Sequence, residues 1–119
     1  SGRLLFVEDD EDQLATTPRV LESLGYEVTA CRGADQALAE LVRAPQAFRL
    51  LITDFDMPGT NGLDLARAAV RLRPDLPVLM VSGRQRAFSA ADAADCLTAV
   101  LPKPFSKAAI SEAIRNALG

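Results

Sequence analysis

The sequence contains no histidine and only two cysteines, Cys31 and Cys96. Histidine is the side chain most often used for acid–base catalysis, and zinc sites are built mainly from cysteine and histidine. The composition therefore argues against a zinc site and against histidine-based catalysis. Both cysteines lie in apolar surroundings in the sequence, which predicts buried, reduced thiols rather than a disulfide and favours a cytoplasmic setting.

Long apolar runs and a basic stripe are also missing. No run approaches the roughly 18 apolar residues of a membrane-spanning helix, and no signal-peptide pattern opens the sequence. With 13 basic and 16 acidic residues the net charge is −3, so the charge of the sequence does not indicate a nucleic-acid-binding surface. The 119 residues suit one domain. Ser1–Gly2 reads as a cloning scar or an excision point, which leaves residues 3–118 as the expected domain.

What the sequence does contain is a dense acidic block near its beginning. Residues 8–12 read EDDED and hold five of the 16 acidic side chains. We expect Asp10, Glu11 and Asp12 to stabilise the positive amino end of a following helix. Glu8 and Asp9 come directly after the apolar run LLFV and are candidates for a functional site.

Short apolar runs alternate with amphipathic segments along the whole chain. The runs cover residues 4–7, 28–31, 50–53, 78–81 and 99–101, and the helix-period segments cover residues 14–24, 34–42, 65–72, 90–97 and 110–117. This (βα)₅ alternation predicts a parallel, doubly wound sheet with right-handed crossovers. In the run at 28–31, apolar and polar residues alternate more than in the other runs, as is typical of an edge strand. Pro18 predicts a kink in the first helix, and Ser106 is the expected N-cap of the last.

Chemically active side chains stand where the predicted strands end. Because parallel strands bring their carboxyl ends to one edge of a sheet, we expect the groups after four of the strands to meet there. They are Glu8 and Asp9, Asp54 and Asp56, Ser82, and Lys103, which lies between two prolines.

Carboxylates without cysteine or histidine select hard cations, namely Mg²⁺, Mn²⁺ or Ca²⁺. Mg²⁺ commonly shares its remaining positions with phosphoryl oxygens, which points to phosphoryl chemistry. A carboxylate can itself act as the nucleophile and form an aspartyl phosphate, while the metal and a lysine neutralise the charge on the phosphoryl oxygens. A serine hydroxyl can donate a hydrogen bond to a further oxygen.

At these residues the chain resembles the receiver domains of two-component response regulators. The pieces that carry the resemblance are LLFVEDD, LLITDFDMPGTNGLDL, VLMVSG and LPKPF, and the match runs over residues 3–118. The resemblance implies a flavodoxin-like fold with strand order 2-1-3-4-5. It implies that Asp54 is the phosphoacceptor, and that Asp9, Asp54 and the backbone carbonyl of Asp56 bind Mg²⁺, with Mn²⁺ as a substitute.

The resemblance assigns roles to the remaining groups as well. It implies that Glu8 contacts the metal through water, that Ser82 is the switch hydroxyl, and that Lys103 pairs with a phosphoryl oxygen and precedes a cis Pro104. The partner it implies is a histidine kinase or a histidine phosphotransfer protein, and the phosphorylated domain would regulate its own or a neighbouring output domain. The domain itself would have at most self-phosphorylation and self-dephosphorylation activity. A parent chain is expected to be a hybrid histidine kinase or a larger response regulator.

Two departures from the family pattern affect how a signal would leave the site. The switch position in the fifth strand, commonly aromatic, is Val100, so the signal would pass through the backbone and repacking of the fourth helix. The usual Gly-Ala pair before that strand is replaced by Leu97–Thr98, which suggests a short fourth helix. As a separate hypothesis, Asp56 and Arg84 pair across the pocket mouth and slow hydrolysis of the acyl phosphate.

Two other functions remain open from the sequence. Residues 54–60, DFDMPGT, also resemble the nucleophile motif of haloacid-dehalogenase-type phosphatases. In that family the motif follows the first strand, a late acidic pair binds Mg²⁺ and a cap domain is usual, whereas here Glu112 is the only carboxylate after Lys103. The other alternative is a pseudo-receiver, an interaction module that is never phosphorylated.

Overall fold

The computed structural model describes residues 2–83 and 95–119, and its centre is a five-stranded parallel sheet. The strand order β2-β1-β3-β4-β5 confirms the predicted topology, with β2 and β5 at the edges. Four of the five strands extend further than the apolar runs that predicted them, by one to three residues each, and only the strand at residues 28–31 matches its run. The strands are β1 Arg3–Val7, β2 Val28–Cys31, β3 Phe48–Asp54, β4 Val78–Ser82 and β5 Ala99–Pro102.

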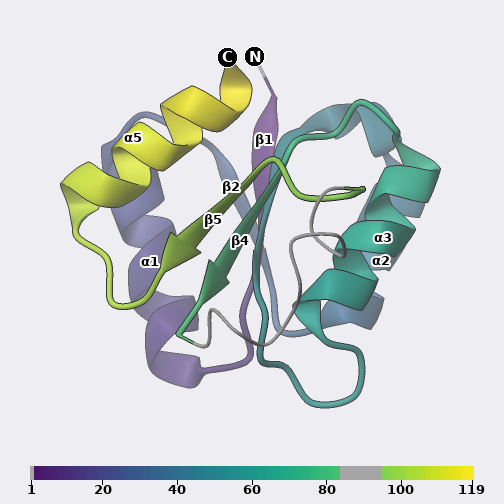
Figure 1. Ribbon diagram of the computed structural model, residues 1–119, viewed down its shortest axis with the longest axis horizontal. Coiled ribbons are helices and arrows are strands. Elements are labelled where there is room, and N and C mark those ends of the chain that lie inside the picture. Colours follow the sequence, from purple (N-terminus) through teal and green to yellow (C-terminus); the bar gives the residue numbers. More distant parts are fainter. Residues whose placement is uncertain (1, 84–94) are drawn as a thin grey trace.

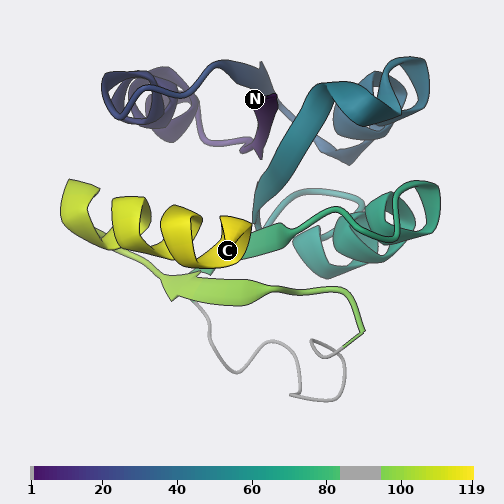
Figure 2. The ribbon, with the colours of Figure 1, turned by 90° about the horizontal axis from the view of Figure 1, so that it is seen from above.

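Helices cover both faces of this sheet (Figure 1). The view from above shows α1 and α5 on one face and α2 and α3 on the other (Figure 2). The helices are α1 Glu11–Ser23, α2 Ala34–Arg43, α3 Gly62–Leu72 and α5 Lys107–Leu118, with a short 3₁₀ turn, η1, at Pro45–Ala47. Most of the helix expected at 90–97 lies outside the described residues. Asp95 and Cys96 form a turn and Leu97 is not helical, so the expected end of that helix at Leu97 is wrong.

The apolar strands bury both of their faces, and this divides the core into two clusters. In β1, Leu5 and Val7 belong to the cluster under α2 and α3, whereas Leu4 and Phe6 belong to the cluster under α1 and α5. All four side chains are at most 3% exposed. Successive side chains of a strand point to opposite faces, so a continuous apolar run is what a sheet covered on both sides requires.

Two helices, α1 and α5, begin at polar residues that the sequence indicated. Asp10 caps α1 by accepting a hydrogen bond from the Asp12 amide at 2.9 Å, and Ser106 caps α5 by accepting one from the Ala109 amide at 3.0 Å. Each side chain satisfies an amide that would have no partner inside the helix. The helix α1 continues through Pro18, and the kink there stays a prediction.

The two cysteines are buried and free, as predicted. Among the residues that the structure describes, no helix is both long and apolar enough to cross a membrane. The carboxyl ends of all five strands face one edge of the molecule, and the start of β1 and the end of α5 lie at the opposite edge (Figure 1). The side chains that follow the strands are therefore gathered far from both termini.

Candidate acidic phosphoryl site

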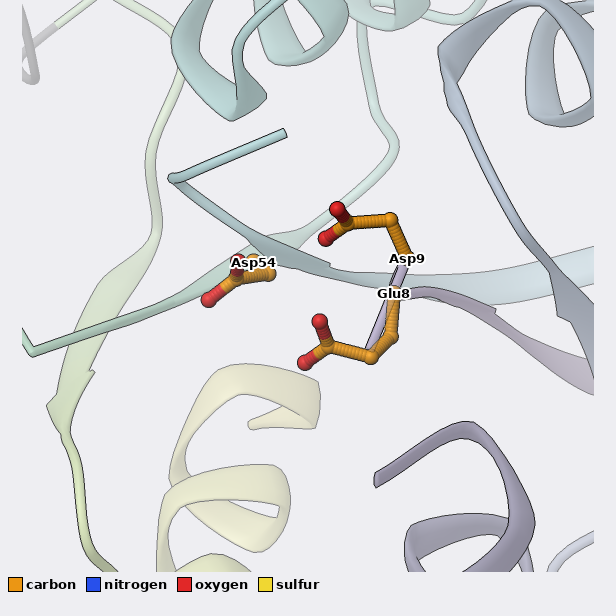
Figure 3. A group of neighbouring side chains, drawn as sticks. All are labelled: Glu8, Asp9 and Asp54. Carbon is orange, nitrogen blue, oxygen red and sulfur yellow. The ribbon is translucent and has the colours of Figure 1, made fainter. Parts of the chain in front are cut away.

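Three carboxylates meet at the carboxyl edge of the sheet. Glu8 and Asp9 follow β1, and Asp54 is the last residue of the neighbouring strand β3. Each contributes an oxygen that lies within 4.8 Å of the others, and Figure 3 shows the three side chains around a common space. The pairing of β1 with β3 sets this geometry, because Val7 is in register with Thr53 and the next residues of both strands are the acids.

Lys103 supplies the positive charge of the site. Its Nζ lies 2.7 Å from Asp54 Oδ1 and 3.1 Å from Glu8 Oε1. Lys103 follows the edge strand β5, and its amide donates to the Ser82 carbonyl at 3.0 Å. The Lys103–Pro104 peptide is cis, as the resemblance implied. One lysine thus bridges acids that follow two different strands.

Burial sets the protonation behaviour of this group. Burial raises the pKa of Asp54, and the ion pair with Lys103 opposes the rise only in part. Burial likewise raises the pKa of Glu8, while the hydrogen bond from the Asp10 amide to its Oε2 opposes this. Burial lowers the pKa of Lys103, but hydrogen bonds to Asp54 and Glu8 outweigh burial, so its pKa is raised overall. All three pKa values are raised, because burial disfavours the charged carboxylates and the neighbouring carboxylates favour the charged lysine.

The other predicted site residues lie around this centre in different ways. Ser82 ends β4, the strand between those of Asp54 and Lys103, and is fully buried. Asp56 is exposed, and its charge contributes to the raised pKa of Asp54. Val100 lies on β5 in register with Met80 and is 38% exposed. Arg84 lies outside the described residues, so its pairing with Asp56 stays a prediction.

Sequence reasoning missed the residues that hold the backbone around Asp54. The Asn61 side chain caps α3 by accepting a hydrogen bond from the Asp64 amide at 2.9 Å, and the next residue, Gly62, packs against the Asp54 carbonyl. Asparagine before the apolar-periodic segment LDLARAAV is a recognisable N-cap signal. The packing of Gly62 has no sequence signal of comparable strength, because it depends on where α3 lies relative to β3.

The donor set suits a hard divalent cation. All three candidate ligands are carboxylates, they come from two adjacent strands, and Asp9 is more exposed than Glu8 and Asp54, which leaves a side open to solvent. Mg²⁺ typically takes one or two carboxylates and keeps several waters, so it does not need a closed protein cage. The acidic triad is therefore suitable for a metal ion, and the excess of carboxylates over Lys103 gives the physical reason.

Comparisons with known proteins agree with this geometry. The family model "Response regulator receiver domain" matches residues 4–115. The chain is 38% identical over 81 residues to the response regulator receiver protein CpdR of Brucella abortus, an alignment that covers 68% of this chain and 66% of that protein. It is 41% identical over 80 residues to the two-component response regulator ARR14 of Arabidopsis thaliana, covering 67% of this chain but only 21% of that protein.

Solved structures share the fold. A CheY-like receiver domain protein from Methanospirillum hungatei superposes with a TM-score of 0.85 at 30% identity, covering 98% of this chain and 93% of that one. The regulator TrrA of Thermotoga maritima, solved in complex with Mg²⁺-BeF, has a TM-score of 0.88 over 98% of this chain and 99% of that one, at 20% identity. The match over nearly the whole chain, together with an acidic triad and a lysine at the carboxyl edge of a 2-1-3-4-5 sheet, shows that this chain belongs to the response regulator receiver domains of two-component systems.

Proposed function

We propose that Asp54 accepts a phosphoryl group from the phosphohistidine of a kinase or phosphotransfer partner, with Mg²⁺ held by Glu8, Asp9 and Asp54. Mn²⁺ fits the same donors. The observation that carries this proposal is the position of the Asp54 carboxylate. It lies 2.7 Å from the Lys103 ammonium and within 4.8 Å of an oxygen of each of two further acids. This arrangement supports the proposal because a carboxylate, an ammonium group and further acids suitable for holding a metal lie in one place.

In the proposed reaction an oxygen of Asp54 attacks the phosphorus of the phosphohistidine. A new O–P bond forms as the P–N bond breaks, and the electron pair of that bond returns to the departing imidazole. The bound metal would neutralise charge on the transferring oxygens. Lys103 would form an ion pair with one phosphoryl oxygen. This contact would replace part of the ion pair that Lys103 makes with the Asp54 carboxylate before phosphorylation. The Ser82 hydroxyl would donate to another, and the Asp56 carbonyl would complete the metal site.

The conformational response would start from Ser82 and Lys103. A phosphoryl group adds up to about two negative charges and three acceptor oxygens, and it shifts a conformational equilibrium only through contacts that differ between the two states. A direct backbone link supports a joint response, since the Lys103 amide donates to the Ser82 carbonyl. With Val100 in place of an aromatic residue, the signal would pass through this β4–β5 backbone and the segment that joins the two strands.

The regulated output is expected outside this domain. The Arabidopsis relative is about five times longer than the segment it shares with this chain. We infer that the phosphorylated domain controls an output domain of a larger response regulator or hybrid kinase, or a separate partner protein, in the cytoplasm.

The proposed pairing of Asp56 with Arg84 would slow hydrolysis of the acyl phosphate. Charge reversal at either position should therefore speed loss of the phosphoryl group, and an unchanged lifetime of the phosphorylated protein would contradict this hypothesis.

Phosphorylation by a small phosphodonor tests the central proposal directly. Incubation with acetyl phosphate and Mg²⁺ should add one phosphoryl group to the wild-type protein, detected by intact-protein mass. The Asp54→Asn variant should gain none. Asp64→Asn is the matched control, because Asp64 is an exposed acid in the first turn of α3 and should leave the reaction unchanged. Phosphorylation of Asp54→Asn at the wild-type rate would overturn the assignment of the acceptor.

The pseudo-receiver alternative makes a different prediction for beryllofluoride. This phosphoryl mimic should bind to the wild-type protein in the presence of Mg²⁺, fail to bind in EDTA, and fail to bind to Asp54→Asn. Backbone amide chemical shifts at Ser82 and Lys103 report the binding. If a folded wild-type protein shows no response to beryllofluoride and no phosphorylation, the interaction-module reading replaces the proposed function.

A further inference from the structure

The first residue of α3 lies directly against the peptide of the candidate phosphoacceptor. A Cβ atom built on Gly62 would lie 2.2 Å from the Asp54 carbonyl oxygen and 2.9 Å from the Phe55 Cα. Gly62 does not have a positive φ, so its backbone conformation is open to any residue. What the position requires is space. The atoms in the way belong to the backbone, so a change of rotamer cannot move them aside.

Hydrogen bonds hold the same stretch of backbone on both sides. The Gly62 amide donates to the Phe55 carbonyl at 2.8 Å, and the Phe55 amide donates to the Val81 carbonyl of β4 at 3.0 Å. The Thr53 hydroxyl donates to the Asp54 carbonyl at 3.0 Å. The Asp54–Phe55 peptide is therefore fixed between the neighbouring strand β4 and the start of α3.

The loop at 56–61 is closed by this contact. It leaves the sheet after Phe55 and returns to it at Gly62, whose amide bonds back to Phe55. Within the loop, Met57 is buried in the core under α2 and α3, and Asn61 caps the first turn of α3. The loop carries the Asp56 carbonyl, which the proposed function assigns to the metal.

We propose that Gly62 is a positioning residue for the phosphoryl site. The absence of a side chain lets α3 start against the Asp54–Phe55 peptide, and this contact fixes where the Asp54 carboxylate stands relative to Lys103, Glu8 and Asp9. The effects that we expect on Mg²⁺ binding and on phosphorylation rest on the proposed function. The effect on the position of the Asp54 carboxylate is independent of the proposed function. Relief of a 2.2 Å contact requires a shift of roughly 1 Å, since non-bonded atoms pack at about 3.5 Å. A shift of that size is enough to disrupt the 2.7 Å contact between Asp54 and Lys103.

The test compares Gly62→Ala with two control variants. Gly33→Ala changes a glycine at the start of another helix, α2, where a Cβ would meet nothing within 4 Å. Leu65→Ala creates a cavity under α3, because Leu65 is fully buried in the core cluster on that side. It therefore controls for a general loss of stability. All measurements are made where circular dichroism shows each variant folded.

We expect Gly62→Ala to weaken Mg²⁺ binding at least tenfold by isothermal titration calorimetry. We expect it to slow phosphorylation by acetyl phosphate about 10- to 100-fold, since a misplacement of about 1 Å can cost roughly a hundredfold in rate. Gly33→Ala and Leu65→Ala should remain within about threefold of the wild type in both. If Leu65→Ala loses as much as Gly62→Ala, the role of Gly62 is only structural and the proposal is overturned. Wild-type behaviour of Gly62→Ala overturns it as well.

A readout that needs neither metal nor phosphate separates this proposal from the proposed function. The amide chemical shifts of Asp54, Phe55 and Lys103 in EDTA should change in Gly62→Ala and stay near wild-type values in the two controls. If the wild-type protein binds no Mg²⁺, the proposed function fails while these shifts still decide the placement of Asp54. If Gly62→Ala does not fold, Asn61→Ala takes its place. Removing the cap of α3 should change the chemical shifts of the same three amides. Unchanged shifts in Asn61→Ala would overturn the proposal.

Discussion

At the scale of single residues, the three acids of the site differ in how much they depend on one another. Glu8 is 2% exposed and Asp54 is 5% exposed, and both contact Lys103. Asp9 lies nearer to solvent, and its charge contributes to the raised pKa of Asp54. Without a metal, the main effect of Asp9 on the site is therefore repulsion, and under the proposed function it becomes a metal ligand when Mg²⁺ binds.

This difference predicts opposite effects of Asp9→Asn in the two conditions. In EDTA, the free energy of unfolding should stay equal or rise slightly, because a repulsive charge is removed. A concentration of Mg²⁺ about ten times its dissociation constant should stabilise the wild-type protein by roughly 1.4 kcal/mol, by mass action. The same concentration should stabilise Asp9→Asn much less. Urea unfolding with and without Mg²⁺ measures both effects.

Asp12→Asn is the matched control for this experiment. Asp12 belongs to the same acidic block but is exposed in the first turn of α1, outside the acidic triad. Its Mg²⁺ response should equal that of the wild type. An equal loss of Mg²⁺ stabilisation in Asp9→Asn and Asp12→Asn would mean that Mg²⁺ responds only to the total negative charge of the acidic block.

Cys31 offers a prediction that is independent of the site. It is fully buried at the end of β2, and burial raises the pKa of its thiol to about 11. At pH 8 the thiolate would be roughly one part in a thousand, and the thiolate is the reactive form. In a Cys96→Ser protein, native Cys31 should react with iodoacetamide at least a hundredfold more slowly than after unfolding in urea. Comparable rates in the folded and unfolded states would contradict the burial of this thiol.

Residue patterns in the sequence were sufficient to place the charged groups of the site but not the backbone contacts. Glu8, Asp9, Asp54 and Lys103 each follow an apolar run, and parallel strands bring such positions together whatever the details of packing. Gly62 depends on the distance between a helix and a strand, which composition and periodicity do not encode.

At the scale of elements, polar side chains cap the start of three of the described helices, α1, α3 and α5. The Ser106 hydroxyl accepts a hydrogen bond from the Ala109 amide at the start of α5. Its position directly before the apolar-periodic segment made the cap predictable from sequence. The end of the expected fourth helix was not predictable in this way, because Leu97–Thr98 carries no strong stop signal and only its tertiary surroundings decide its conformation.

The cap of α5 predicts a measurable loss. Ser106→Ala should lower the free energy of unfolding by about 1 kcal/mol, because the Ala109 amide loses its partner. Ser106→Asp should keep most of the stability, since a carboxylate can accept the same hydrogen bond. Denaturant unfolding of the three proteins measures the differences. A Ser106→Ala variant as stable as the wild type would show that water replaces the cap without cost.

At the scale of the whole molecule, the sheet separates two apolar clusters that share no side chains. Leu41 of α2 belongs to the cluster on one face, and Ile114 of α5 belongs to the cluster on the other. The sequence predicted a sheet buried on both faces from its continuous apolar runs. The strand order came from the family resemblance, because periodicity alone does not say which strands are neighbours.

The separation predicts that core changes on the two faces add. Leu41→Ala should cost about 2–5 kcal/mol and Ile114→Val about 0.5–1.5 kcal/mol, the usual ranges for removing buried methyl and methylene groups. The double variant should equal the sum within about 0.5 kcal/mol, as distant sites do. Urea unfolding of the four proteins completes this cycle. A larger discrepancy would show that strain crosses the sheet.

The start of β1 and the end of α5 lie at the edge of the sheet opposite the carboxyl ends of the strands, where the acidic triad lies (Figure 1). A protein tethered to a sensor surface through either end would therefore present the triad to the solution. Orientation should not limit measurements of partner capture, and a fluorescent label fused to either end would sit far from the phosphoryl-transfer chemistry.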